Sequence, residues 1–265
     1  MSAVTLASGL TLSYAHQGIA ADPPLVLLPG PTDSWRSYQL VLDRLPPETH
    51  AVSVSQRGHG DSDKPFGGYR VEDYAADVVP LLDACGIDRA VIAGHSGSCL
   101  VARRVALDHP ERVAGLVLEA SPTTLRDDAR LVDFVEVVLA DLQDPISPDF
   151  ARSFVTGTSS VGIPRDLVDL LAEEVVKVPA HVWLGTFAGL LRYDDMTELG
   201  RIAAPTLLLW GDADGVVSRD MQDQLVRSIA DAELRVYDDV GHTPRWERPA
   251  QFSRDLVGFL HRVVR

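Results

Sequence analysis

The sequence is poor in cysteine and in basic residues, and it has no long apolar run. Its 265 residues include two cysteines, and 24 Lys and Arg residues stand against 38 Asp and Glu residues, for a formal net charge of −14. Such an acidic surface repels nucleic-acid phosphates and anionic lipids, so we expect neither nucleic acid nor a membrane as a partner. No stretch approaches the ~18 apolar residues of a membrane-spanning helix. The two cysteines, Cys85 and Cys99, form no disulfide framework and are expected to be small buried side chains.

Motifs that bind cofactors and metals are also missing. The chain has no Gly-Lys-Ser/Thr phosphate loop, no paired-cysteine motif and no His-Glu-x-x-His sequence, and its eight histidines lack metal-ligand spacing. We therefore expect no cofactor and no metal. The first residues lack the charged region and apolar core of a secretory signal. These absences favour a cytoplasmic protein, a monomer or homodimer, whose partner is a small-molecule substrate.

Short apolar segments alternate with helical patterns along most of the chain. Residues 4–6 and 10–16 flank Ser8-Gly9 and predict an antiparallel hairpin at a sheet edge. Later strand-like segments, most of them followed by a helical pattern, lie at 25–28, 51–54, 90–93, 113–118, 206–209 and 234–237. This alternation favours parallel strands joined by helical crossovers. We predict an α/β fold with a doubly wound, mostly parallel sheet of about eight strands and an antiparallel edge hairpin.

The alternation is interrupted once, between residues 122 and 195. This segment contains helical runs and prolines but no convincing strand. It follows a predicted strand, so it would leave the sheet at the carboxyl edge, and we predict a helical cap at 122–195 on a core formed by 1–121 and 196–265. Most cap aromatics are expected to form its core, and some to line a substrate cavity. The candidates for substrate binding are Trp35, Phe134, Phe154, Trp183 and Phe187.

The segment Gly94-His95-Ser96-Gly97-Ser98 lies between a predicted strand and a predicted helix. Small residues at 94, 97 and 98 permit a tight bend that would hold Ser96 at the helix N-terminus, with the Gly97 N–H beside it. A serine hydroxyl is a poor nucleophile unless a base activates it and an acid orients that base. Both partners follow later in the chain. Asp212 and Asp214 come directly after one predicted strand, and His242 comes after the last.

With these segments the chain resembles the cap-bearing, serine-hydrolase and esterase branch of the α/β-hydrolase superfamily over nearly its whole length. The elbow and the order serine, aspartate, histidine match that family. Four further segments are similar to family loops: Leu27 to Gly30, the Arg57-Gly58-His59-Gly60-Asp61-Ser62 loop, Gly211 to Asp214, and Gly241 to Pro249.

The resemblance implies a role for each residue of the constellation. Ser96 would be the nucleophile and His242 the general base. Asp214 occupies the family's acid position, with Asp212 and then Glu119 as the alternatives. The histidines at positions 59 and 95 and Arg57 are expected to be structural.

One position departs from the family pattern. An oxyanion hole needs two N–H donors, and Gly97 would supply one. The second usually comes from the residue after the His-Gly or Pro-Gly pair, which here is Pro31, and proline has no N–H. We expect Thr32 to replace it with its N–H or its hydroxyl. A shifted loop, a weak enzyme or a non-hydrolytic one are the alternatives.

The resemblance implies a serine hydrolase that cleaves a small neutral carboxylic ester or lactone through an acyl-enzyme. Carbon–carbon bond hydrolases and cofactor-free peroxidase-like enzymes share the same constellation and are alternatives within the family. A non-catalytic protein that binds a small ligand on a hydrolase scaffold is the alternative of another class, because Pro31 removes a donor.

Overall fold

A computed structural model describes residues 2–18, 23–160 and 162–264 of the chain, so the ends of the predicted core, residues 1 and 265, lie outside the description. Its centre is an eight-stranded sheet in the order β1-β2-β4-β3-β5-β6-β7-β8. The pairs β1–β2 and β2–β4 are antiparallel and all others are parallel, which confirms the predicted mostly parallel sheet with an edge hairpin. The strands are β1 (Ser2–Thr5), β2 (Thr11–Gln17), β3 (Leu25–Leu28), β4 (Ala51–Val54), β5 (Ala90–His95), β6 (Val113–Glu119), β7 (Thr206–Gly211) and β8 (Ala232–Tyr237).

The central strands are apolar runs because helices cover both faces of the sheet. Every residue of β3, β4, β5 and β6 is buried. Side chains alternate between the two faces of a strand. Val26 and Leu28 accordingly pack into one hydrophobic cluster, and Leu25 and Leu27 pack into another on the opposite face.

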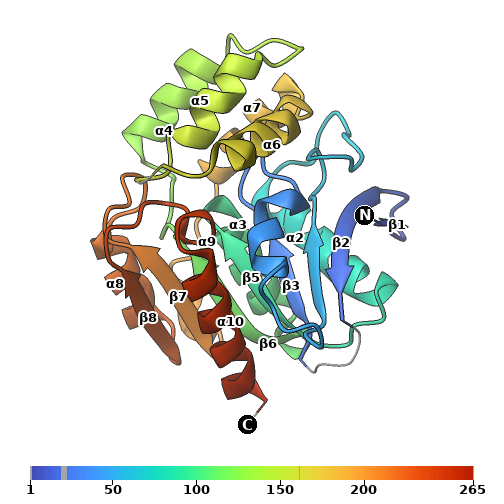
Figure 1. Cartoon of the computed structure of the whole chain (residues 1–265), viewed down its shortest axis with the longest axis vertical. Helices are drawn as coiled ribbons and strands as arrows, with labels where there is room; N and C mark the ends of the chain where they lie inside the picture. Colours follow the sequence, from blue (N-terminus) through green and yellow to red (C-terminus); the bar gives the residue numbers. More distant parts are fainter. Residues whose placement is uncertain (1, 19–22, 161, 265) are drawn as a thin grey trace.

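Two sets of helices cover the two faces of the sheet and complete these clusters (Figure 1). The first face is covered by α2 (Val71–Ala84), α3 (Gly97–Asp108) and α8 (Arg219–Ser228). The second is covered by α1 (Gln39–Leu42) and α10 (Pro249–Val263), beside the short α9 (Pro244–Glu247). A 3₁₀ turn, η1 (Trp35–Tyr38), directly precedes α1.

The residues between β6 and β7 form a helical layer, the upper layer, over the carboxyl ends of the strands (Figure 1). Three of its helices contain aromatic residues that pack together, with Trp183 stacked on Phe187 at a centroid distance of 5.9 Å and Phe154 edge-on to Trp183 at 4.7 Å. The first helix of this layer is an α-helical turn that continues as a π-helical one. The helices are α4 (Ala129–Asp133), η3 (Phe134–Leu139), α5 (Pro148–Thr156), α6 (Arg165–Val176) and α7 (Ala180–Leu190).

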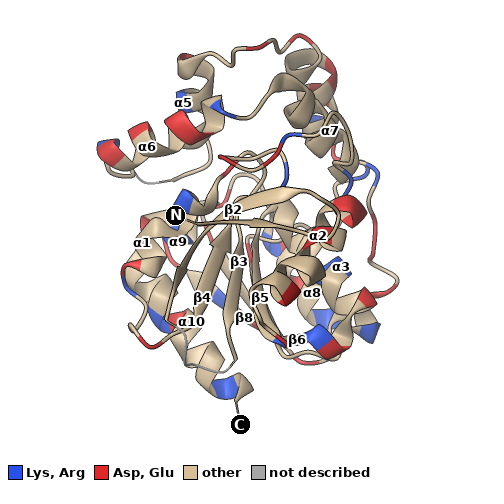
Figure 2. Ribbon diagram, turned by 90° about the vertical axis from the view of Figure 1, so that its right-hand side faces the viewer, with Lys and Arg blue, Asp and Glu red and all other residues tan. Residues whose placement is uncertain are grey.

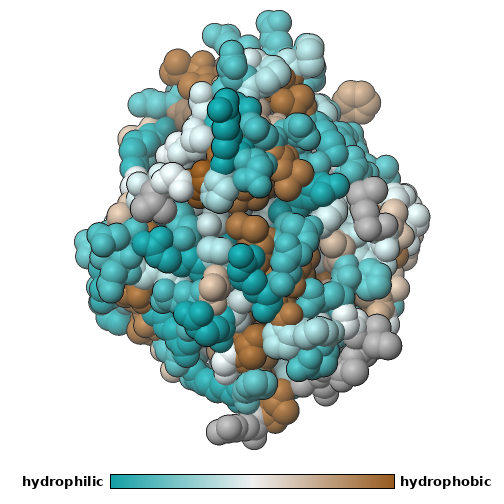
Figure 3. Space-filling model, viewed as in Figure 1, coloured by the Kyte–Doolittle hydropathy of each residue, from teal (hydrophilic) through white to brown (hydrophobic). Residues whose placement is uncertain are grey.

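The surface is acidic and mostly polar. Figure 2 shows Asp and Glu on helices of both the sheet layer and the upper layer. Figure 3 shows a largely hydrophilic face in which apolar side chains occur singly or in small groups. Within the described part of the chain, no helix is both long and apolar enough to cross a membrane.

Candidate active site

Ser96 lies on a sharp turn between β5 and α3. Its φ of 52° and ψ of −125° are unusual for a residue with a side chain. The flanking glycines permit this turn: a Cβ on Gly94 would lie 2.5 Å from the Ser98 carbonyl oxygen, and one on Gly97 would lie 2.9 Å from Pro31 Cγ. The local sequence therefore holds Ser96 at the carboxyl edge of the sheet and the start of a helix.

A continuous chain of hydrogen bonds joins Ser96, His242 and Asp214. Ser96 Oγ lies 2.9 Å from His242 Nε2, and His242 Nδ1 lies 2.9 Å from Asp214 Oδ2. The histidine side chain is 4% exposed and the aspartate side chain is fully buried. Loops after β5, β7 and β8 thus bring together three residues that are far apart in the sequence.

Asp214 is the only one of the three predicted acids that contacts His242. Its other oxygen, Oδ1, accepts main-chain N–H bonds from Val216 and Val217 at 2.7 and 3.0 Å, which fixes the carboxylate. Asp212 is exposed and accepts the N–H of Asp239 at 2.8 Å, a turn-stabilising role. The third candidate, Glu119, bonds elsewhere, as described below.

The backbone of His242 is held from two sides. Its N–H donates to the carbonyl oxygen of Thr158 in the upper layer at 3.0 Å, and its own carbonyl oxygen lies 3.0 Å from His95 Nε2. Because a carbonyl only accepts, His95 Nε2 carries the proton and Nδ1 does not. Burial lowers the pKa of His95 well below its ordinary value, so this imidazole stays neutral. Residues His95 and Thr158 therefore position the histidine, a role that the sequence pattern did not reveal.

A buried ionic cluster lies behind the histidine loop. The Arg245 guanidinium is fully buried and lies 2.7 Å from Asp33 Oδ2 and 3.3 Å from Glu119 Oε1. Tyr38 donates to Glu119 Oε2 at 3.1 Å, and Ser37 donates to Asp33 Oδ2 at 2.8 Å. Burial raises the pKa of both carboxyls, and the nearby guanidinium opposes that rise. One cation is thus shared by two carboxylates. Neither Asp33 nor Arg245 stood out in the sequence, because the family motif in each segment, the loop after β3 and the turn into α9, points to neighbouring residues.

A cavity of about 230 Å³ opens at Ser96. Its wall is largely apolar and comes from both the sheet loops and the upper layer. It is formed by Pro31, Asp33, His95, Ser96, Leu131, Phe134, Phe154, Val155, Thr158, Phe187, Val216, His242, Thr243 and Trp246.

Three of the five predicted substrate-binding residues, Phe134, Phe154 and Phe187, line this cavity. The other two do not. Trp183 is fully buried within the aromatic core of the upper layer, and Trp35 is 7% exposed beneath the Arg36 guanidinium, 4.7 Å from its ring centre. The large indole side chains of these two tryptophans favour burial in a hydrophobic core over a place in the cavity wall.

The structure does not bring Thr32 to the cavity wall. Pro31 and Asp33 line the cavity, whereas Thr32 is 1% exposed and its hydroxyl is buried without a hydrogen-bond partner among the described residues. A φ of 73° at Thr32 turns its side chain into the interior. Of the two groups of Thr32 expected as donors, the hydroxyl thus lies away from the cavity and the main-chain N–H stays a prediction, while Gly97 starts α3 directly beside Ser96.

Arg57 and His59 tie their loop to the rest of the core. Arg57 makes two bonds of 2.6 Å to Asp77, and His59 Nδ1 lies 2.7 Å from the Arg57 carbonyl oxygen. Neither side chain lines the Ser96 cavity. Both have the structural role expected of them.

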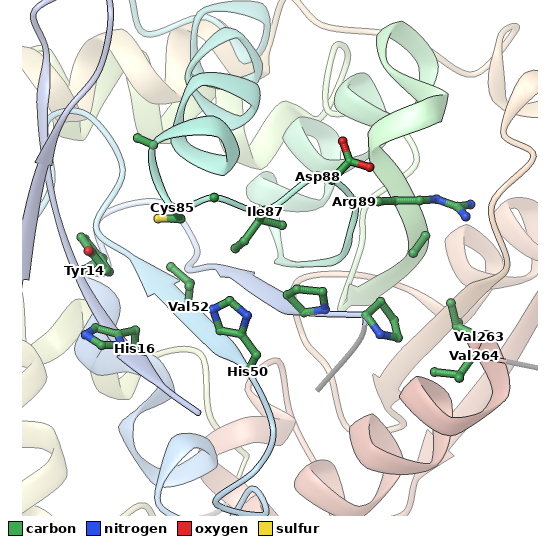
Figure 4. Close-up of a pocket in the computed structure, with 15 residues that line it drawn as sticks. Tyr14, His16, His50, Val52, Cys85, Ile87, Asp88, Arg89, Val263 and Val264 are labelled. Carbon is green, nitrogen blue, oxygen red and sulfur yellow. The ribbon is translucent and has the colours of Figure 1, made fainter. Parts of the chain in front are cut away.

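A larger open hollow lies at the opposite, amino edge of the sheet (Figure 4). Figure 4 shows His16, His50 and Cys85 around it, with Arg89 and Val263 farther along the wall. No group of three His, Cys, Asp or Glu side chains is arranged as a metal site among the described residues. This hollow shares no residue with the cavity at Ser96.

A serine on an elbow above a parallel sheet, bonded to a histidine and an aspartate from later loops, defines the class of α/β-hydrolases. The family model for the alpha/beta hydrolase fold matches residues 23–249, and the chain belongs to this family.

Individual relatives are diverse in the reactions that their names state. The chain is 31% identical over 96% of its length, and 97% of the relative, to RutD of Variovorax paradoxus, provisionally named a carbamate hydrolase. Among solved structures it is similar to Est816, described as an N-acyl homoserine lactone degrading enzyme, with 28% identity, a TM-score of 0.80 and coverage of 95% and 97% of the two chains. An esterase from Exiguobacterium antarcticum superposes with a TM-score of 0.87 at 21% identity, covering 98% and 99%, which supports the fold alone.

Proposed function

We propose that this protein is a serine hydrolase that cleaves a small, neutral carboxylic ester or lactone through an acyl-enzyme. The observation that carries the proposal is the unbroken hydrogen-bond chain from Ser96 through His242 to Asp214, with both contacts at 2.9 Å. Family membership and the named activities of the relatives support a hydrolase.

Each residue has a defined task in the proposed reaction. His242 Nε2 takes the hydroxyl proton as Ser96 Oγ attacks the substrate carbonyl. Asp214 holds the tautomer of His242 in which Nδ1 is protonated and stabilises the imidazolium. His242 then gives the proton to the departing alkoxide, and in the second half of the cycle it activates the water that releases the acid.

The tetrahedral intermediate needs donors for its oxyanion. We assign one to the Gly97 N–H and the other to the main-chain N–H of Thr32, since Pro31 has none. Burial of the Thr32 hydroxyl away from the cavity supports the main-chain group over the side chain.

The cavity supports a small substrate that carries no negative charge. Its volume of about 230 Å³ fits a compact acyl or lactone ring, and no Lys or Arg belongs to its described lining. A substrate carboxylate would thus find no cation on this wall. The helical layer, the predicted cap at 122–195, would cover the substrate and exclude water.

A fluorophosphonate probe followed by a panel of p-nitrophenyl esters and lactones of graded length tests the proposal. We expect covalent labelling at Ser96, no labelling of Ser96→Ala, and turnover that declines on acidification, because an imidazolium cannot accept the serine proton. Absence of a label would favour the ligand-binding alternative. A labelled Ser96 without ester or lactone turnover would refute the substrate class and favour a carbon–carbon bond hydrolase or peroxidase-like enzyme.

A further inference from the structure

Asp33 is the only Asp, Glu, Lys or Arg residue in the described lining of the Ser96 cavity. The polar side chains in the rest of that wall are neutral hydroxyl and imidazole groups, those of Ser96, Thr158, Thr243, His95 and His242. A charged group is costly to bury beside apolar side chains unless it has partners. The two side chains that donate hydrogen bonds to Asp33 both bind the same carboxylate oxygen.

The two oxygens of Asp33 have different environments. Oδ2 accepts from Arg245 at 2.7 Å and from Ser37 at 2.8 Å, both fully or almost fully buried. Oδ1 has no hydrogen-bond partner among the described residues, the side chain is 8% exposed, and Asp33 belongs to the lining of the cavity. The carboxylate is therefore fixed at one oxygen and free to accept at the other.

Among the described residues, Asp33 has one ion-pair partner, Arg245. Arg245 is shared with Glu119, so one guanidinium faces two carboxylates. A hydrogen-bond donor or a cation on a bound molecule would satisfy Oδ1 and offset this excess, whereas an anion would be repelled.

Asp33 also lies on the histidine side of the nucleophile. Asp33 bonds to Arg245 of the histidine segment, and His242, Thr243 and Trp246 of that segment line the cavity with it. In the proposed reaction His242 Nε2 passes its proton to the leaving group, which would place the alcohol portion of an ester on this side of the cavity.

We propose that Asp33 is a specificity-determining residue that accepts a hydrogen bond or ion pair from the alcohol portion of the substrate. The substrate class is an ester whose leaving alcohol carries an ammonium or another strong donor within a few atoms of the ester oxygen. This inference rests on the proposed hydrolase function and refines its substrate: the acyl portion stays small and neutral, and the alcohol portion carries the cation or strong donor.

Three butyrate esters of similar shape test the assignment at pH 8: the choline ester, its uncharged 3,3-dimethylbutyl isostere, and the anionic 2-sulfoethyl ester. For the wild type we expect kcat/KM for the choline ester to exceed that for the isostere by about tenfold or more, and the sulfoethyl ester to be the poorest. In Asp33→Asn the ratio of choline ester to isostere should fall toward one. A ratio near one in the wild type, or a ratio unchanged in Asp33→Asn, would overturn the proposal.

Two features make Asp33→Asn a suitable variant. The asparagine oxygen still accepts from Arg245 and Ser37, and Glu119 remains as the charged partner of Arg245, so the fold should persist. The matched control is Asp223→Asn, which removes the same charge from an exposed pair with Arg219 and should keep the wild-type ratio. The ratio is taken within one enzyme, so a general loss of activity cancels.

A binding measurement separates failure of this assignment from failure of the hydrolase function. In Ser96→Ala, calorimetry should show tighter binding of the choline ester than of the isostere, and Ser96→Ala/Asp33→Asn should lose that preference. Hydrolysis without a charge preference would refute the role of Asp33 and leave the hydrolase intact. A preference in binding without fluorophosphonate labelling or hydrolysis would support Asp33 and refute the hydrolase.

Discussion

His95 and His242 contact each other through the side chain of one and the main chain of the other. His95 Nε2 donates to the His242 carbonyl oxygen at 3.0 Å, and the two rings lie 4.9 Å apart. His95, the residue immediately before Ser96, thus holds the loop that carries His242. The distance between Ser96 and His242 depends on this bond as well as on Asp214.

Loss of the His95 side chain should therefore weaken catalysis by displacing His242. In His95→Ala we expect kcat for a p-nitrophenyl ester to fall roughly tenfold, because small displacements of a catalytic group have large effects on rate. His95→Gln retains an N–H donor of similar reach and should recover part of the loss. Unfolding in urea checks that both variants are folded. Wild-type kcat in His95→Ala would show that the bond to His242 is dispensable.

The two aspartates after β7 should differ sharply in importance. Asp214→Asn removes the charge that stabilises the imidazolium and disturbs the tautomer of His242, so kcat/KM should drop about 10³–10⁴-fold. Asp212→Asn still offers an oxygen to the Asp239 N–H and should stay within a few-fold of the wild type. Steady-state kinetics with one ester compares both variants. The reverse ranking would contradict the assignment of Asp214 as the acid.

Local patterns in the sequence predicted the sheet and made Ser96 and His242 candidates, while the family resemblance favoured Asp214 over Asp212 and Glu119. Strands such as β3 are continuous apolar runs, and the elbow requires glycine at 94 and 97. The residues that no local pattern reveals are those whose partners lie far away in the chain. Asp33 and Arg245 are 212 positions apart, and only the folded chain shows that they meet.

The aromatic residues of the upper layer illustrate a second limit. Phe187 and Trp183 lie one helical turn apart on α7, yet only Phe187 reaches the cavity. Residues at this spacing share one face of a helix, so periodicity cannot separate the cavity wall from the core behind it. That separation depends on how α5 and η3 pack against α7.

The hydroxyl of Thr32 should be dispensable and even unfavourable. It is buried without a hydrogen-bond partner among the described residues, and such a group costs stability relative to a methyl group of the same shape. Thr32→Val should raise the free energy of unfolding by about 1 kcal/mol. It keeps the main-chain N–H, so kcat should change little. A loss of about 10²-fold or more in kcat would instead assign the oxyanion contact to the hydroxyl.

His59 should make stability depend on pH between about 4 and 6.5. Burial lowers the pKa of His59 from 6.5 to about 4, and its Nε2 has no hydrogen-bond partner among the described residues. Between these values the unfolded chain binds a proton that the folded chain does not. The neutral imidazole therefore contributes its full stability above pH 6.5, and that contribution is lost as the pH falls toward 4. The shift corresponds to about 3 kcal/mol.

Urea unfolding of His59→Gln at a series of pH values measures this contribution. The free energy of unfolding of the variant should improve relative to the wild type as the pH falls from 7 to 4, because glutamine has no proton to gain. His109→Gln removes an exposed histidine and should follow the wild-type profile. His95 also has a lowered pKa, so some pH dependence should persist in His59→Gln. Parallel profiles for the wild type and His59→Gln would show that His59 does not remain neutral in the folded protein.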